Sequence, residues 1–267
     1  MKKILNSKTI PYIVIGGSVV GLLLRLWTLG TGADAFGLYP RNPLAWVLLW
    51  LLTAAVIAAV VVAIRPLKKS GNYHENYPKS VPGMIGYVLA GGCFIMSGIN
   101  QLGNLTGITD QVAAIAGLIA GAVMLVLGVL RLLGKKPNCL LHGLICLYFA
   151  IRLFNQCQLW SNEPQTGIII MPFLGTMCLL LSAYQRICFD VGLGNRRVML
   201  FWSLLATYFC IVAVLSFREI AYYAACALWQ MTNLCSLRPD KKKKPEQVVE
   251  ANAPDLSMEE PETPEEE

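Results

Sequence analysis

Long apolar segments recur along this chain and constrain its fold more than any other feature. Each is close to the ~20 residues that a helix needs to cross the hydrocarbon core of a bilayer. The segments are 10–30, 44–64, 82–103, 109–131, 139–158, 167–185, 198–216 and 219–236. Hydrophobic residues make up 55% of the chain and charged residues 14%, whereas soluble domains carry ~25% charged residues. The pattern predicts an all-α, polytopic integral membrane protein with eight transmembrane helices arranged as four hairpins.

Basic residues gather in every second loop, which predicts the orientation of the spans. The start of the chain and the loops after the second, fourth, sixth and eighth spans are basic, whereas the intervening loops are nearly free of basic residues. The basic positions are Lys2, Lys3, Lys8, Arg65, Lys68, Lys69, Lys79, Arg131, Lys135, Lys136, Arg186, Arg196, Arg197, Arg238 and 241–244. Because short basic loops stay in the cytoplasm, we expect a multi-pass cell-membrane protein with both termini inside.

The first span also permits a second interpretation. A basic start, an apolar run and the sequence Ala33-Asp34-Ala35 resemble a secretory signal peptide with a cleavage site. The apolar run is longer than a typical signal, and Arg25 interrupts it near its end, which favours an uncleaved span. Cleavage would leave seven spans with the mature N-terminus outside.

Charge divides the chain into a transmembrane domain, residues 1–236, and a cytoplasmic tail, residues 237–267. The first carries 17 lysines and arginines and six acids, whereas the tail carries five and ten. The basic run 241–244 can meet anionic lipid headgroups, and the acidic remainder has no hydrophobic periodicity, so we expect a disordered tail. Its end, 259–267, is interpreted as a solubilising extension or as a site for a protein partner. The net charge of +6 averages these two regions and does not indicate nucleic-acid binding.

Small residues recur at four-residue spacing in three spans. Gly17 and Gly21 lie in the first span and Gly117 and Gly121 in the fourth. Alanines of the second span repeat the spacing at Ala54, Ala55, Ala58 and Ala59. Small residues at this spacing let helix backbones approach closely, so we expect them to pack helices together within one chain.

Polar side chains inside the spans are the main candidates for a site. They fall at three- and four-residue steps and so share a helix face in the third and fifth spans. With the predicted topology they lie in the outer half of the membrane, where an unpaired arginine costs ~2.5–3.5 kcal/mol. The candidate ligand-binding residues are Arg25, Asn100, Gln101, Arg152, Asn155, Gln156 and Glu219.

Three classes of function fit these residues. In the first, Arg25 and Arg152 line a cavity open to the outside and bind a small polar solute, anionic or zwitterionic, because guanidinium pairs with carboxylate and phosphate through two hydrogen bonds. In the second, the same residues form a satisfied interhelical network, and the protein is a non-catalytic scaffold or sensor subunit with a partner at its tail. A lipid-modifying enzyme that uses Glu219 or Arg152 is the third. We take binding or transport as the leading hypothesis.

Residue patterns typical of enzymes and metal sites are absent from the sequence. The two histidines, His74 and His142, belong to no HExxH motif, paired-carboxylate cluster or Cys/His ligand set. The nine cysteines form no CxxC pair and are interpreted as small buried side chains. His142, beside Cys139 and Cys146, is interpreted as a core residue. We therefore expect no enzyme activity, no cofactor and no metal.

The sequence Gly32-Ala33-Asp34-Ala35-Phe36-Gly37-Leu38, the eight apolar segments and the charged tail resemble uncharacterised polytopic membrane proteins of anaerobic Gram-positive bacteria. The likeness is one of type. It implies a multi-pass membrane protein and no particular site residues.

Overall fold

The computed structural model describes residues 10–31, 43–67, 73–103, 107–162, 166–215 and 219–237. The described part of the chain is all-helical. Its helices are α1 (Ile10–Gly30), α2 (Pro43–Ile64), α3 (Tyr73–Asn76), α4 (Val81–Gly103), α5 (Ile108–Leu133), α6 (Cys139–Asn162), α7 (Thr166–Val191), α8 (Arg196–Ala213) and α9 (Ile220–Cys235). The predicted cleavage site at Ala33–Asp34–Ala35 and the tail from residue 238 onward lie outside the described residues.

Seven of the described helices are long and apolar enough to cross a membrane, namely α1, α2 and α4 to α8. This agrees with seven of the eight predicted spans. The eighth prediction corresponds to α9, which has 16 residues and therefore a length of roughly 24 Å at 1.5 Å per residue. That is shorter than the ~30 Å hydrocarbon core. The short helix α3 lies in a predicted cytoplasmic loop and was not expected.

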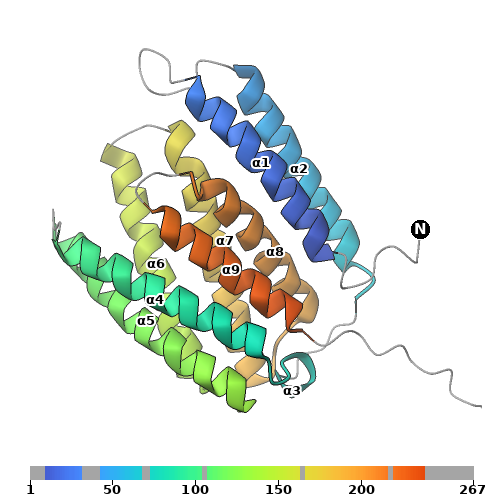
Figure 1. Cartoon of the computed structure of the whole chain (residues 1–267), viewed down its shortest axis with the longest axis vertical. Helices are drawn as coiled ribbons and strands as arrows, with labels where there is room; N and C mark the ends of the chain where they lie inside the picture. Colours follow the sequence, from blue (N-terminus) through green and yellow to red (C-terminus); the bar gives the residue numbers. More distant parts are fainter. Residues whose placement is uncertain are drawn as a thin grey trace, which may run out of the picture.

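Helices α4 to α9 pack side by side in a closed ring (Figure 1). Each packs on the next along the chain, and α9 returns to pack on α4. We call this arrangement the six-helix ring. Helix α1 packs on α2 and α8, so these two N-terminal helices lie on the outside of the ring. The contacts run between the predicted hairpins as well as within them, because α6 packs on both α5 and α7.

Glycines bring α4 and α5 together. A Cβ atom added at Gly121 would lie 2.8 Å from the carbonyl oxygen of Gly91, and one added at Gly98 would lie 2.9 Å from the carbonyl oxygen of Ala114. A backbone oxygen cannot move aside as a flexible side chain can. The prediction that Gly121 packs helices within the chain is therefore confirmed.

The small residues of α1 and α2 behave differently from one another. A Cβ at Gly17 would lie 2.8 Å from Val56 of α2, and one at Gly21 would lie 2.9 Å from Val212 of α8, so both glycines serve internal packing as predicted. The alanine positions of α2 are instead exposed, because the opposite face of this helix, with Leu49 and Val56, is the buried one. For Ala54, Ala55, Ala58 and Ala59 the prediction of internal packing is wrong.

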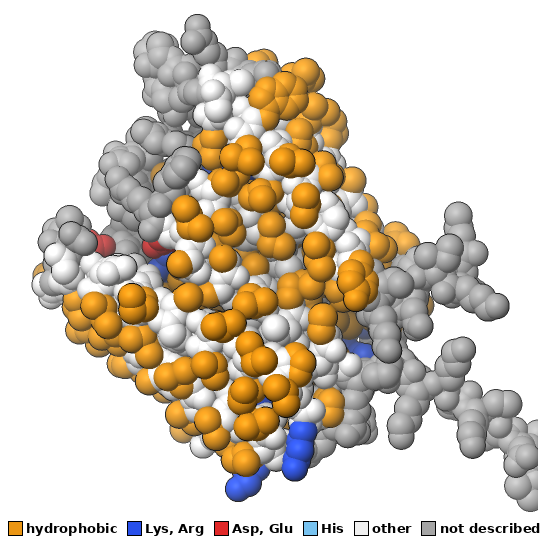
Figure 2. All heavy atoms as spheres, viewed as in Figure 1, with side chains coloured by type: hydrophobic (Ala, Val, Ile, Leu, Met, Phe, Trp, Pro, Cys, Tyr) orange, Lys and Arg blue, Asp and Glu red, His pale blue; other side chains and the backbone are white. Residues whose placement is uncertain are grey.

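Large apolar side chains cover the outside of the helices. Figure 2 shows them over most of the described part of the visible face, where only a few Lys and Arg side chains appear and the most prominent of these lie at the lower end. Leu23, Leu51, Ile115 and Leu147 are each more than half exposed, which a protein surrounded by water avoids. Such a surface is compatible with contact to lipid and with a multi-pass membrane protein.

Candidate functional site

An ion pair joins two of the predicted residues inside the six-helix ring. Arg152 of α6 donates from Nη2 to Oε2 of Glu219, which directly precedes α9. The side chain of Arg152 is 5% exposed and that of Glu219 is 28% exposed. The guanidinium is therefore enclosed, whereas solvent can reach the carboxylate. This end of the ring is the one predicted to face the outside.

Aromatic residues of α6 and α9 surround the pair. The guanidinium of Arg152 lies over the ring of Tyr222, 3.7 Å from its centroid, and its Nη1 donates to the hydroxyl of Tyr148, one turn earlier on α6, at 3.5 Å. Nε2 of Gln156 donates to the hydroxyl of Tyr223 at 2.8 Å. We call these groups the outer cluster; its members are Arg152, Glu219, Gln156, Tyr148, Tyr222 and Tyr223.

The remaining predicted site residues lie elsewhere. Asn155 points toward α5, where its Nδ2 donates to Oδ1 of Asp110 at 3.2 Å. Asn100, at the end of α4, is exposed, and Gln101 is half-buried. Arg25 is buried on α1, one turn after the glycine that packs on α8. Of the seven candidates, the described contacts thus join Arg152 and Glu219, with Gln156 beside them.

An aromatic layer fills the middle of the ring. Phe94 of α4 stacks on Tyr222 at 5.3 Å between centroids and meets Phe149 of α6 edge-on at 5.9 Å. Phe149 in turn stacks on Trp229 of α9 at 6.2 Å. Phe94, Phe149 and Trp229 are fully buried. This layer separates the outer cluster from a second polar group at the opposite end.

The second polar group centres on Arg186 of α7. Its Nη1 donates to the hydroxyl of Tyr87 at 2.7 Å and its Nη2 to Oε1 of Gln230 at 3.0 Å. The guanidinium also lies 4.5 Å from the ring centroid of Trp229. Arg186 is only 2% exposed, although the sequence pattern had suggested a loop charge.

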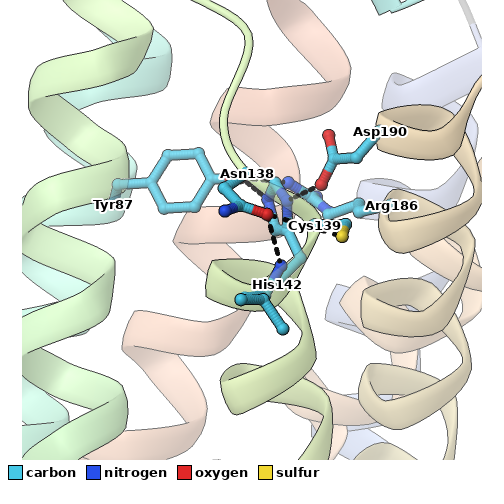
Figure 3. A network of polar contacts seen from close by, with 7 residues as sticks. Tyr87, Asn138, Cys139, His142, Arg186 and Asp190 are labelled. Atoms are coloured by element: carbon cyan, nitrogen blue, oxygen red, sulfur yellow. Dashed lines mark hydrogen bonds and ion pairs between the residues drawn. The ribbon is translucent and has the colours of Figure 1, made fainter.

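His142 belongs to the same group, as Figure 3 shows. Its Nδ1 lies 2.5 Å from Oδ2 of Asp190, and its Nε2 lies 3.3 Å from the hydroxyl of Tyr87. The predicted core position of His142 is confirmed by its burial, but its surroundings are polar. Tyr87 therefore connects the His142–Asp190 pair to Arg186.

A second arginine, Arg131 in the last turn of α5, completes this end. Its Nη2 donates to Oγ of Ser236 at 2.9 Å, and its guanidinium lies 4.6 Å from the ring centroid of Tyr77. Arg131 is 3% exposed. We call Tyr87, Arg131, His142, Arg186, Asp190 and Gln230 the inner cluster, because this end of the ring is predicted to face the cytoplasm.

Two tyrosines close the inner cluster from the segment before α4. Burial raises the pKa of the Tyr77 hydroxyl above its ordinary value, and burial likewise raises the pKa of the Tyr73 hydroxyl, which lies beside Arg131. Both hydroxyls therefore stay protonated at neutral pH. They therefore contribute no negative charge to balance the arginines, and the Tyr77 hydroxyl is buried without a hydrogen-bond partner among the described residues.

The sequence contains one signal for the inner cluster. Ser182, Arg186 and Asp190 are four residues apart and so share one face of α7. Gln230 and Asn233 are three residues apart on α9, a spacing that also places two side chains on one helix face. Arg186 lies in the last two turns of its helix, where a basic residue also agrees with a cytoplasmic helix end. Because the charge has that explanation, the sequence does not by itself indicate a buried polar face on α7.

In the described residues, no three His, Cys, Asp or Glu side chains gather as a metal site would require. No protein-family model, curated protein or solved structure matches this chain. Its function therefore has to be inferred from the two polar clusters inside the ring.

Proposed function

We propose that this protein is a non-catalytic integral membrane protein that binds, and carries across the membrane, a small polar solute with a carboxylate or similar anionic group. The solute enters at the outer cluster and exchanges with the Arg152–Glu219 ion pair. The observation that carries the proposal is this pair, enclosed on the arginine side and open on the glutamate side.

The chemistry of the pair suits an anionic or zwitterionic solute. Guanidinium binds a carboxylate through two parallel hydrogen bonds, so an incoming carboxylate can replace that of Glu219. The released Glu219 can then accept a hydrogen bond from an ammonium group of the same solute. Tyr222 holds the guanidinium plane from one face and limits its reorientation during the exchange.

The rest of the six-helix ring supports movement of the solute through the protein, rather than binding at the outer surface alone. A polar cluster lies at each end, and the aromatic layer of Phe94, Phe149 and Trp229 closes the space between them. Transporters typically bind their solute inside the bundle and open one side at a time. Movement of α9 would couple the two ends, because this helix carries residues of both clusters and of the layer.

A thermal-shift screen of the purified full chain tests the proposal. Wild-type protein is heated with carboxylates, phosphates, amino acids and neutral sugars, each at one pH and ionic strength. We expect stabilisation by at least one carboxylate or amino acid and none by neutral sugars. Uptake of that solute into proteoliposomes then tests transport.

The matched variants are Arg152→Lys and the double variant Arg152→Gln with Glu219→Gln. The first variant keeps the positive charge but cannot form two parallel hydrogen bonds with one carboxylate. The second removes both charges and keeps the volume of the Glu219 side chain. We expect both variants to fold and to lose most of the stabilisation by the solute. The proposal would be contradicted if no solute raised the melting temperature of folded wild-type protein. It would also be contradicted if the solute stabilised the double variant as much as wild type.

A further inference from the structure

We infer that the inner cluster contains a second binding site, between Arg131 and Arg186, for one small monovalent anion of the size of chloride. This site lies at the opposite end of the ring from the Arg152–Glu219 pair. Anion binding at this site requires neither the proposed solute nor transport.

The described residues of the inner cluster carry more positive than negative charge. Among the described residues, no carboxylate lies within ion-pair distance of Arg131 or Arg186. The one acid of the cluster, Asp190, places its Oδ2 on His142. Among the described residues of the cluster, two buried guanidinium groups therefore face one carboxylate, which leaves a surplus of at least one positive charge. A buried charge without a counter-charge is costly, and an anion would balance it.

Several buried hydrogen-bond donors of the two arginines have no partner in the part of the chain that the structure describes. Nε and Nη1 of Arg131 and Nε of Arg186 are buried and have no hydrogen-bond partner among the described residues. Both side chains line one small cavity, together with Tyr87, His142 and Asp190. Oδ1 of Asp190 is also without a partner. An anion must therefore lie on the arginine side of the cavity, away from this oxygen.

The small size of the cavity limits which anion it can hold. The space open to the centre of a water-sized sphere in this cavity is about 10 Å³, which is roughly the room that one water molecule needs. A single chloride is only slightly larger than water and needs a small outward shift of the lining side chains, whereas phosphate and sulfate, with four oxygens, need several times this space. Water fits but carries no charge. Leu127, Leu130 and Pro137 form the apolar part of the wall, which suits a weakly hydrated ion.

The experiment uses full-length protein purified in detergent in sodium gluconate, a salt whose anion is too large for the cavity. Gluconate is replaced stepwise by chloride or bromide at constant ionic strength. The readouts are the melting temperature and the line width of the ³⁵Cl resonance. We expect saturable stabilisation by both halides, broadening of the ³⁵Cl line by the protein, and no such stabilisation by sulfate or phosphate.

Variants assign the effect to the site. Arg131→Gln and Arg186→Gln each remove one of the two charges and should weaken halide binding by at least about tenfold. Asp190→Asn removes the opposing charge and should strengthen it by a similar factor. Lys135→Gln, an exposed base four residues after Arg131, is the control for general surface charge and should bind as wild type.

The outcomes separate clearly. Halide binding that weakens in the arginine variants and strengthens in Asp190→Asn supports the site. Wild type that shows neither stabilisation nor line broadening with halide overturns it and leaves the cavity to water. Binding of sulfate in place of halide, or halide binding equal in all variants, overturns it too. If Arg186→Gln fails to fold, Arg131→Gln and Asp190→Asn still decide.

Discussion

Neutralising Glu219 should destabilise the fold, because its partner would stay buried with an unbalanced charge. In Glu219→Gln the amide keeps the volume of the side chain and can still accept one hydrogen bond from Arg152. The guanidinium remains 5% exposed and keeps its contacts with Tyr222 and Tyr148. None of these contacts carries a formal negative charge.

The size of the effect follows from the burial of the two partners. Removing one partner of a buried ion pair costs about 3–5 kcal/mol. Since Glu219 is 28% exposed, water already screens part of the interaction, and we expect about 2–3 kcal/mol. For a chain of this size, 1 kcal/mol corresponds to ~2–4 °C in melting temperature. Glu219→Gln should therefore melt roughly 4–12 °C below wild type.

Thermal unfolding in detergent, followed by tryptophan fluorescence, measures this loss in a double-mutant cycle. The double variant Arg152→Gln with Glu219→Gln has no unbalanced charge and should recover most of the loss, because replacing both partners is far less costly than replacing one. A single variant that melts within about 1 °C of wild type, or a double variant that loses the sum of both single losses, would refute the reasoning.

Two further predictions concern packing and topology. Gly91→Ala should lower the melting temperature, because the new Cβ would lie 2.9 Å from the carbonyl oxygen of Gly121, whereas Gly92→Ala, with nothing within 4 Å, should leave it unchanged or raise it; equal melting of the two variants would contradict the packing of α4 on α5. In single-cysteine variants on intact cells, exposed Cys157 should react with a membrane-impermeant maleimide and buried Cys210 should not; labelling of Cys157 only after permeabilisation would reverse the predicted orientation.

The outer cluster shows how far a helix-face pattern can lead. The spacing of Tyr148, Arg152 and Gln156 correctly indicated one polar face on α6, because side chains four residues apart lie one above the other. It could not indicate which helix that face meets. Glu219 is 67 residues away from Arg152, and Asn155, next to Gln156, turns to Asp110 on another helix.

The inner cluster shows where the pattern misled. Basic residues near the ends of spans obey the rule for cytoplasmic loops wherever their side chains point. Arg131 and Arg186 satisfy that rule, yet they turn inward because their helices continue to Leu133 and Val191 and their faces at those turns meet α9. Orientation and burial are separate properties, and loop charge reports only the first.

The sequence alone determined the class of protein and the positions of seven membrane-length helices, because the cost of burying a segment in lipid is summed over its own ~20 residues and needs no neighbour. The tertiary structure alone decided that α9, too short to span by itself, closes the ring against α4, and that Arg152 meets Glu219 while Arg186 meets Tyr87 and Gln230. These choices depend on the rotation and order of the helices. Two features set that order. Helix backbones approach closely at glycines such as Gly91 and Gly121, and aromatic side chains fit together between the helices.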